Sequence, residues 1–251
     1  MGKVIGIINQ KGGVGKTTTA VNLAACLALN GHKTLLIDSD SQGNTTTGLG
    51  FEKEKLHITL YEVLINREEP SSAIIKTKIK KLHLLPAKTS LAGAEIELVN
   101  MEEREYVMKK MISAVAGQYE YIIIDCPPSL GLMTLNSLVA SDSILVPIQA
   151  EFYALEGVVQ LMKTMKSVQK KMNPSLYLEG VMLTMFDGRT NLSIQVAEEV
   201  KKYFGEKVFR TLIPRSVKIS ESPSFGEPVV VYDPKSKGAE AYKKLCREVV
   251  R

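Results

Sequence analysis

Apolar runs rich in Val and Ile recur along the chain and are separated by longer stretches of mixed polarity. A short continuous apolar run is typical of a strand that is buried on both faces, as in a parallel sheet. The pattern therefore predicts strands at Val4–Ile8, Thr34–Ile37, Leu82–Leu85, Tyr121–Ile124, Ile144–Pro147 and Leu178–Thr184.

The stretches between these runs repeat their apolar positions with a helical period. They predict helices at Thr17–Leu29, Thr59–Leu64, Glu97–Val115, Leu130–Val139, Leu155–Met172 and Leu192–Phe204. Strands alternating with helices indicate an α/β fold with a doubly wound, mainly parallel sheet flanked by helices, which binds ligands at the carboxyl ends of its strands. Gly31 follows the first helix, where a left-handed residue often ends a helix. Prolines mark loops in the C-terminal third, which we assign to the same sheet: Pro174, Pro214, Pro223, Pro228 and Pro234.

Length and composition favour a single domain over residues 1–251. The chain has 251 residues, of which 45% are hydrophobic, and it contains neither a repeat nor a low-complexity linker. The apolar run Val4–Ile8 is too short for the core of a signal peptide. No stretch approaches the roughly 18 apolar residues that a membrane-spanning helix needs. We therefore expect a cytoplasmic protein.

Net charge and cysteines add little to the functional assignment. The net charge of +5 is a moderate basic bias, and alone it is weak evidence for nucleic-acid binding. Cys26, Cys126 and Cys246 lie far apart in the sequence and form no CxxC pair. We interpret them as small buried hydrophobic residues of a reducing compartment, not as disulfides or metal ligands.

The segment Gln10–Thr18 carries the strongest chemical signal. It follows the first strand and opens into a helix, and its Gly-Gly-x-Gly backbone can wrap a phosphate chain at the helix N-terminus. Lys16 can reach the β- and γ-phosphates of a nucleotide, and the Thr17 hydroxyl suits Mg²⁺. Gln10 stands where the strict Walker A pattern has glycine. A glycine-rich turn with incidental lysines is the alternative, and the preceding strand disfavours it.

Two apolar strands end in carboxylates that can complete this site. Tyr121–Asp125 has the Walker B arrangement, in which the aspartate holds Mg²⁺. Asp38 and Asp40 follow another strand, and we favour Asp40 as the group that orients the attacking water and lies near the metal. Asp38 either caps its strand or holds the loop.

Lys11, a second lysine in front of the glycines, resembles the signature lysine of the deviant Walker A family of P-loop NTPases. Nearly the whole chain resembles its ParA/Soj branch, the chromosome- and plasmid-partition ATPases. The matching segments are Asn9–Gly13, Asp40 with Gln42–Asn44, Asp125–Ser129, Glu151–Gly157, Leu183–Asn191, Ile213–Arg215 and Ser220–Ser224. The family usually has proline where this chain has Ser41, and without that ring we expect a more flexible loop.

The resemblance implies an ATPase that uses ATP and Mg²⁺ and forms an ATP-dependent homodimer. Lys11 would reach the nucleotide of the partner subunit, and Lys11, Lys16 and Asp40 would be catalytic. Thr17, Asp40 and Asp125 would hold the metal. ATP is preferred over GTP because the guanine motif is absent near Thr184–Asp187. The implied ATP-binding residues are Lys11, Gly12, Gly13, Val14, Gly15, Lys16, Thr17 and Thr18 around the phosphates, and Met185, Pro214 and Arg215 around the adenine.

The resemblance also implies that the dimer binds DNA non-specifically through Arg189 and Lys218. A ParB/Spo0J-like centromere-binding protein would stimulate hydrolysis, and the ATP-bound protein would associate with the bacterial nucleoid. Phosphate contacts of this kind carry no sequence preference. Other basic residues are interpreted as solvated surface charges: Lys163, Lys166, Lys170 and Lys171 on one helix, and Lys235 and Lys237 in a loop.

Three related classes remain as alternatives. A MinD-like ATPase would insert a C-terminal amphipathic helix into the membrane. The stripe Tyr242, Leu245, Cys246, Val249 and Val250 fits better a helix packed on the sheet, so we expect no stable membrane association. A nitrogenase-type iron protein needs two cluster cysteines per subunit, and only Cys126 lies at a suggestive position. An ATP-dependent small-molecule ligase or synthase of the same fold is the third.

Overall fold

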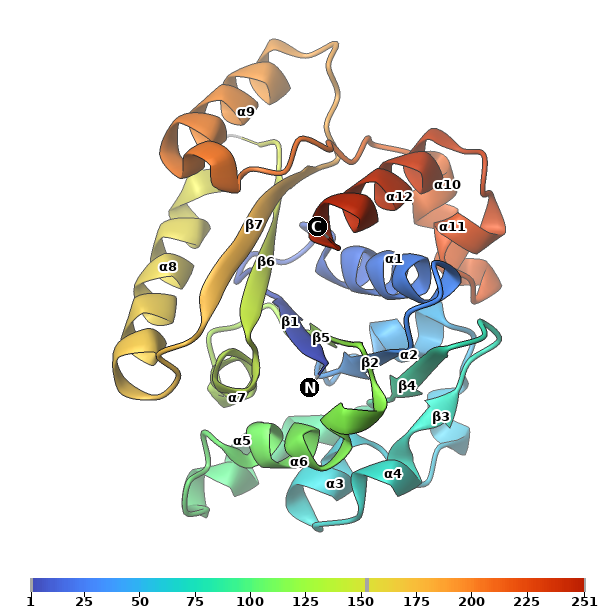
Figure 1. Cartoon of the computed structure of the whole chain (residues 1–251), viewed down its shortest axis with the longest axis vertical. Helices are drawn as coiled ribbons and strands as arrows, with labels where there is room; N and C mark the ends of the chain where they lie inside the picture. The colour runs from blue at the N-terminus through green and yellow to red at the C-terminus, as the bar shows by residue number, and fades with distance from the viewer. Residues whose placement is uncertain (1, 152–153, 251) are drawn as a thin grey trace.

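A seven-stranded sheet forms the centre of the computed structural model, which describes residues 2–151 and 154–250. Its strand order is β3-β4-β2-β5-β1-β6-β7, and every neighbouring pair is parallel except β3 with β4 (Figure 1). The predicted doubly wound, mainly parallel sheet is confirmed. Its strands are β1 (Lys3–Ile7), β2 (Thr34–Asp38), β3 (Ile75–Lys76), β4 (Leu82–Leu85), β5 (Tyr121–Asp125), β6 (Ser143–Gln149) and β7 (Tyr177–Thr184).

Strand β3 was not predicted from the sequence. It contains two residues and pairs antiparallel with β4 at the edge of the sheet, so it is too short to show a periodic pattern. The C-terminal third joins the sheet through β7. After β7 the described residues add only two isolated bridges, Val181 to Val208 and Phe186 to Pro214.

Two hydrophobic cores lie on opposite faces of the sheet because successive strand residues point to opposite sides. In β5, Ile122 and Ile124 belong to one core and Ile123 to the other. The core of Ile123 also contains residues of α1 (Lys16–Leu29), α11 (Val229–Tyr232) and α12 (Lys237–Val249). The opposite core contains residues of α3 (Leu60–Ile65), α5 (Leu91–Glu97), α6 (Val107–Val115), α7 (Leu132–Ala140), α8 (Ala154–Lys171) and α9 (Asn191–Phe204).

The predicted single helix over Glu97–Val115 is wrong. The chain forms α5 and α6 with a turn between them, and Glu103 in that turn has φ 51°. Asn136 of α7 fixes the turn from outside, because its side-chain amide donates to the Arg104 carbonyl at 2.8 Å and accepts from the Met108 N–H at 3.1 Å. A tertiary contact thus interrupts a segment whose composition alone favours helix.

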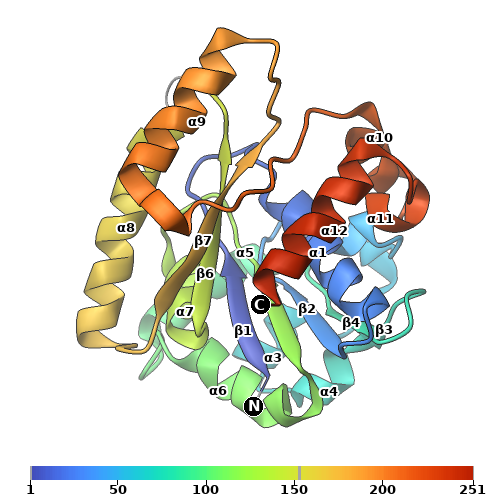
Figure 2. The same cartoon turned by 45° about the horizontal axis from the view of Figure 1, so that its top comes forward.

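Helix α12 packs inward, as predicted, and lies side by side with α1 in both views (Figures 1 and 2). Tyr242, Leu245 and Cys246 are buried, and the helix packs against α1 and α11. Val250, at the end of the stripe, is exposed. None of the helices in the described ranges combines the length and apolar character needed to cross a bilayer.

The three cysteines are buried and not disulfide-bonded, as predicted. The fold nevertheless brings two of them together, since Cys246 of α12 lies next to Cys26 of α1, and this neighbour and burial raise the pKa of Cys26. Cys126 lies elsewhere, at the end of β5.

The carboxyl ends of β1, β2 and β5 meet in the middle of the sheet. Asp125 at the end of β5 is in register with Ile7 of β1 and with Asp38 of β2. The segment after β1 therefore lies directly beside both strand-end carboxylates. This is the position where a doubly wound sheet binds its ligand.

Candidate active site

The loop between β1 and α1 is shaped by glycines with positive φ. Gly13 has φ 74° and Gly15, the residue before α1, has φ 86°, a region that residues with a Cβ rarely enter. Asn9 secures the start of the loop, because it accepts the Lys11 N–H at 3.0 Å and donates to the Pro147 carbonyl at 2.7 Å. Val14 is buried, so only its backbone can face a phosphate.

The side chains of the two lysines of the loop, Lys16 and Lys11, lie in different environments. Lys16 is only 6% exposed, and its Nζ spans the loop to donate to the Lys11 carbonyl at 3.0 Å. Burial lowers the pKa of Lys16, and the negative charges of Asp125 and Asp40 oppose that shift. The Lys11 ammonium lies outside the loop, 3.4 Å from a carboxylate oxygen of Glu151. Only Lys16 is directed into its own phosphate loop.

Asp125 has one carboxylate oxygen that is ready for a further ligand. Its Oδ2 accepts the Thr45 hydroxyl at 2.7 Å, whereas its Oδ1 is buried and has no hydrogen-bond partner in the described part of the chain. Burial raises the pKa of Asp125 to about 6, although the hydrogen bond from Thr45 and the nearby Thr17 act in the opposite direction. An orphaned buried oxygen next to a threonine hydroxyl fits a hydrated Mg²⁺, which prefers oxygen ligands.

Asp38 holds the loop that carries Asp40. Of the two roles considered for Asp38, capping its strand or holding the loop, the structure supports the second. Asp38 accepts the Asp40 N–H at 3.3 Å, the Thr46 N–H at 2.9 Å and the Thr46 hydroxyl at 2.7 Å. Burial raises the pKa of Asp38 to about 7, and the neighbouring Asp125 adds to the rise. Asp40 itself is 8% exposed and accepts the Gln42 N–H at 2.9 Å.

Ser41 occupies a closed turn in this loop. The Gly43 N–H donates to the Asp40 carbonyl at 2.9 Å, so Ser41 is the second residue of a four-residue turn. Proline is favoured at that position because its fixed φ suits the turn. The hydrogen bond forms here without it.

The residues expected around the adenine come together in one pocket of about 190 Å³. Met185, Pro214 and Arg215 line it beside Gly15 and Thr18 of the phosphate loop. Backbone bonds fix this wall, since the Phe186 N–H donates to the Ile213 carbonyl at 3.0 Å and the Arg215 N–H to the Phe186 carbonyl at 3.3 Å. Three further lining residues were not predicted as part of the site: Ile219 and Ser220 lie in a short C-terminal helix, and Pro223 lies in the turn that follows it.

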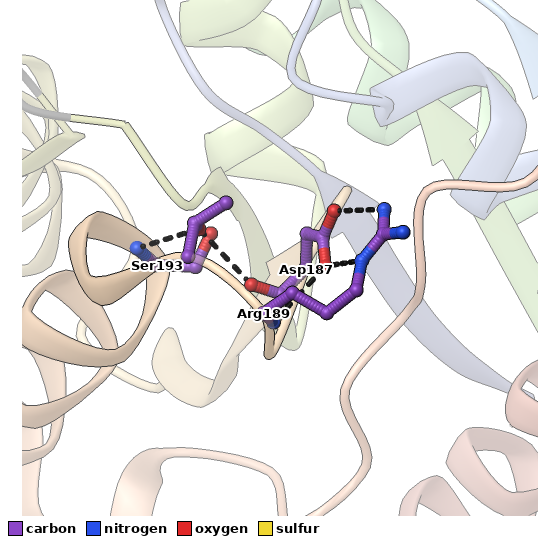
Figure 3. A network of polar contacts seen from close by, with 4 residues as sticks. Asp187, Arg189 and Ser193 are labelled. Atoms are coloured by element: carbon purple, nitrogen blue, oxygen red, sulfur yellow. Dashed lines mark hydrogen bonds and ion pairs between the residues drawn. The ribbon is translucent and has the colours of Figure 1, made fainter.

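The two residues expected to contact DNA lie outside this site, and each is paired with a carboxylate. The Arg189 guanidinium binds Asp187 through Nε at 2.9 Å and Nη2 at 2.6 Å (Figure 3). Thr190 beside it caps α9 by accepting the Ser193 N–H at 3.3 Å. Lys218, in α10 (Val217–Glu221), contacts Glu221 at 2.7 Å.

The other basic residues occupy exposed positions. Lys163, Lys166, Lys170 and Lys171 lie on the outer side of α8, opposite its buried Leu161 and Val168. Lys237 is the first residue of α12, so its assignment to a loop is wrong. Phe152 and Tyr153, which belong to one of the matching segments, lie outside the described residues.

The chain matches known proteins over most of its length. Residues 2–178 match the family model described as an AAA domain. The chain is 56% identical over 249 residues to the sporulation initiation inhibitor protein Soj of Bacillus subtilis, with 99% of this chain and 98% of that protein covered. It is 51% identical over 251 residues to the chromosome partitioning protein ParA of Myxococcus xanthus, covering 100% and 89% of the two.

A solved structure is similar over the whole chain. Cobyrinic acid a,c-diamide synthase from Mycobacterium smegmatis, crystallised with bound ADP and magnesium, is 39% identical with a TM-score of 0.89. The match covers 100% of this chain and 95% of that one. Its ligands agree with the predicted ATP and Mg²⁺. Together with the sequence relatives, these findings place the chain in the ParA/Soj family of chromosome-partitioning ATPases.

Proposed function

We propose that this ATPase forms a homodimer when it binds ATP, that the dimer binds DNA without sequence preference, and that partner-stimulated hydrolysis returns it to monomers. The cycle would serve chromosome or plasmid segregation, with the ATP-bound dimer on the nucleoid. The position of Lys11 is the single observation that carries this proposal.

Lys11 lies at the edge of the phosphate loop, and its side chain does not point into that loop. Its side chain is 37% exposed and its ammonium lies against Glu151, whereas Lys16 already occupies the interior of the loop. Gly12 and Gly13 beside it are exposed, and a Cβ added to either would meet nothing within 4 Å. This open, glycine-lined surface leaves room for a second subunit to approach. A lysine placed there can reach a nucleotide across the interface.

Within each subunit the proposed roles follow from burial and charge. Lys16 and the loop N–H groups hold the phosphates, and Met185, Pro214 and Arg215 hold the adenine. Thr17 and Asp125 hold Mg²⁺ together with Asp40. When bound, the metal ion neutralises charge that develops on the phosphate oxygens. Asp40 orients the attacking water, for which its position beside Lys16 and Asp125 is suitable.

The proposed DNA face must exchange one set of ion pairs for another. Arg189 has an 89% exposed side chain and Lys218 a 48% exposed one, so phosphates can reach both. To bind a phosphate, each cation must loosen its bond to Asp187 or Glu221. Exposed ion pairs contribute about 0–1 kcal/mol, so the exchange is feasible. A ParB/Spo0J-like partner would then trigger hydrolysis and release.

Gly12→Val tests the dimer directly. The added side chain meets open space within the subunit, so ATP binding should survive, while the approach of the partner subunit is blocked. Sedimentation of the wild-type protein should show an ATP-dependent dimer, and the variant should stay monomeric with ATP bound. Lys11→Ala should lose the dimer as well. A Gly12→Val dimer of normal strength would contradict a close approach at this loop.

A second candidate function rests on the similarity to the cobyrinic acid a,c-diamide synthase structure, at 39% identity. Such an enzyme would couple ATP hydrolysis to amide formation on cobyrinic acid. The relatives named Soj and ParA are more similar, at 56% and 51%, and favour partition. Turnover measured with DNA and partner, or with cobyrinic acid and an amide-nitrogen donor, separates the two candidates.

A further inference from the structure

Two adjacent threonines of α2 (Asn44–Gly48) contact two different strand-end carboxylates. The Thr45 hydroxyl donates to Asp125 Oδ2 at 2.7 Å, and the Thr46 hydroxyl donates to Asp38 Oδ2 at 2.7 Å. Both threonines are fully buried. Neither contact was predicted, because a short polar helix start shows no periodic pattern.

The contact of Thr45 concerns the carboxylate assigned to the metal. Asp125 has two oxygens, and Thr45 occupies Oδ2 while Oδ1 stays free of hydrogen bonds from the described residues. The backbone of Asp125 is fixed as well, since its carbonyl accepts the Ser39 N–H at 3.0 Å and the Ser39 hydroxyl at 2.7 Å. With the backbone fixed, Thr45 is the contact that sets the rotation of the carboxylate.

The contact of Thr46 instead stabilises the loop that carries Asp40. Its hydroxyl accepts the Ala87 N–H at 3.0 Å while donating to Asp38, so it ties α2 to the segment after β4. Asp38 in turn accepts the N–H of Asp40 at 3.3 Å. The bond from Thr46 therefore leads to the residue that orients water and does not touch Asp125.

We infer that Thr45 and Thr46 are separate positioning residues for the ATPase reaction: Thr45 aims Asp125 Oδ1 at the Mg²⁺ site, and Thr46 holds Asp38 and thereby the Asp40 loop. The roles of Asp125 and Asp40 are those of the proposed function. Residues behind a metal ligand orient it, and their loss typically weakens metal affinity about 10- to 100-fold. Thr45 has the geometry for this effect and Thr46 does not.

Nucleotide binding with and without metal separates the two roles. The dissociation constant of a non-hydrolysable ATP analogue is measured in EDTA and in saturating Mg²⁺. The constant in EDTA divided by the constant in Mg²⁺ is the Mg²⁺ ratio, which measures how much the metal strengthens binding. Thr45→Val should reduce this ratio about tenfold or more, with the EDTA value changed little. Thr45→Ser keeps the hydroxyl and should retain the wild-type ratio.

Thr46→Val is the matched control at the adjacent buried position. It should lower ATP turnover at saturating Mg²⁺ by about tenfold or more, because a displaced Asp40 no longer aligns the water. It should reduce the Mg²⁺ ratio clearly less than Thr45→Val does, because it leaves the contact of Asp125 with Thr45 in place. If Thr45→Val does not fold, Thr45→Ala is measured in its place, with circular dichroism as the check.

Three outcomes would overturn the inference: an unchanged ratio in a folded Thr45 variant without the hydroxyl, an equal loss of the ratio in Thr46→Val, or no rescue by Thr45→Ser. Failure of the proposed function is recognised separately. If Asp125→Asn binds the analogue with the same Mg²⁺ ratio as wild type, the metal assignment itself is wrong. If that variant loses the ratio and Thr45→Val keeps it, only the role of Thr45 fails.

Discussion

The phosphate site and the proposed DNA face use the same kinds of side chains in opposite surroundings. At the phosphate site Lys16, Asp38 and Asp125 are almost completely buried. On the DNA face the Arg189 side chain is 89% exposed. Burial penalises charge, so it lowers the pKa of Lys16 and raises the pKa of both aspartates.

Exposure has the opposite consequence at Arg189. Its bond to Asp187 lowers the pKa of that carboxyl to about 2, yet solvent screens the pair and a phosphate can replace the carboxylate. This difference supports the proposal that one region binds a ligand of fixed geometry and the other a polymer of any sequence. Buried charges are stabilised only by a counter-charge in a specific position, whereas exposed ion pairs can exchange partners.

The largest effect is expected at Asp40. Asp40→Ala should lower ATP turnover by about 100- to 1,000-fold, because loss of a group that positions or accepts a proton commonly costs that much. ATP binding and dimerisation should survive, so the protein should remain on DNA. Steady-state phosphate release and sedimentation with ATP and DNA measure these effects. Wild-type turnover in the presence of DNA and partner would assign the role to another group.

Lys16→Ala should weaken ATP binding by about a hundredfold or more, since charge-assisted hydrogen bonds contribute about 1.5–3 kcal/mol each and this lysine is assigned to the β- and γ-phosphates. Titration calorimetry with ATP and Mg²⁺ gives the affinity. Lys163→Ala, an exposed lysine of α8, is the control and should bind ATP normally. Unchanged affinity in Lys16→Ala would remove the assignment of the loop.

Arg189→Ala should weaken DNA binding and halve its salt dependence. If Arg189 and Lys218 each make one phosphate contact per subunit, the dimer makes about four, and the slope of log affinity against log salt is about −3.6. Raising salt from about 50 to about 200 mM then costs on the order of a hundredfold in affinity. The variant should give a slope of about −1.8 with unchanged ATP binding. An unaltered slope would place the basic face elsewhere, as on α8.

Asp187→Asn should tighten DNA binding about threefold, because it releases Arg189 from an exposed ion pair of this strength. Asparagine can still accept the Arg189 N–H that Asp187 Oδ1 accepts at 3.1 Å, so the turn should be kept. Glu198→Gln on α9 changes the charge equally without this contact and should tighten binding less. In the Arg189→Ala background the effect of Asp187→Asn should vanish. Persistence there would show that Asp187 does not act through Arg189.

The smallest expected effect is on stability. Asp38 and Asp125 have a pKa of about 7 and about 6 in the folded protein, against an ordinary value of 3.8. The folded state thus binds more protons between about pH 4 and 7, and this contribution to stability is lost as pH rises through that range. Between pH 6 and 8 the Tm of the nucleotide-free protein should fall about 2–4 °C more than that of Asp38→Asn. Parallel pH profiles would contradict the raised pKa.

The sequence alone determined the six parallel strands of the sheet, the glycine-rich loop and the family. Apolar runs ending in Asp38 and Asp125 predicted the strands and the site at their carboxyl ends, because buried parallel strands have a strong local pattern. The glycines of the loop predicted its shape equally well, since only glycine readily adopts the φ values found at Gly13 and Gly15. These features depend on neighbours in the chain.

Only the tertiary structure decided the features that depend on distant partners. Asn136 interrupts the helix predicted over Glu97–Val115, and Asp187 pairs with the arginine that was expected to contact DNA. The division of labour between Thr45 and Thr46 also appears only when β2 and β5 lie in register. A hydrogen bond between residues far apart in sequence leaves no periodicity, so its donor and acceptor look like ordinary polar residues until the chain has folded.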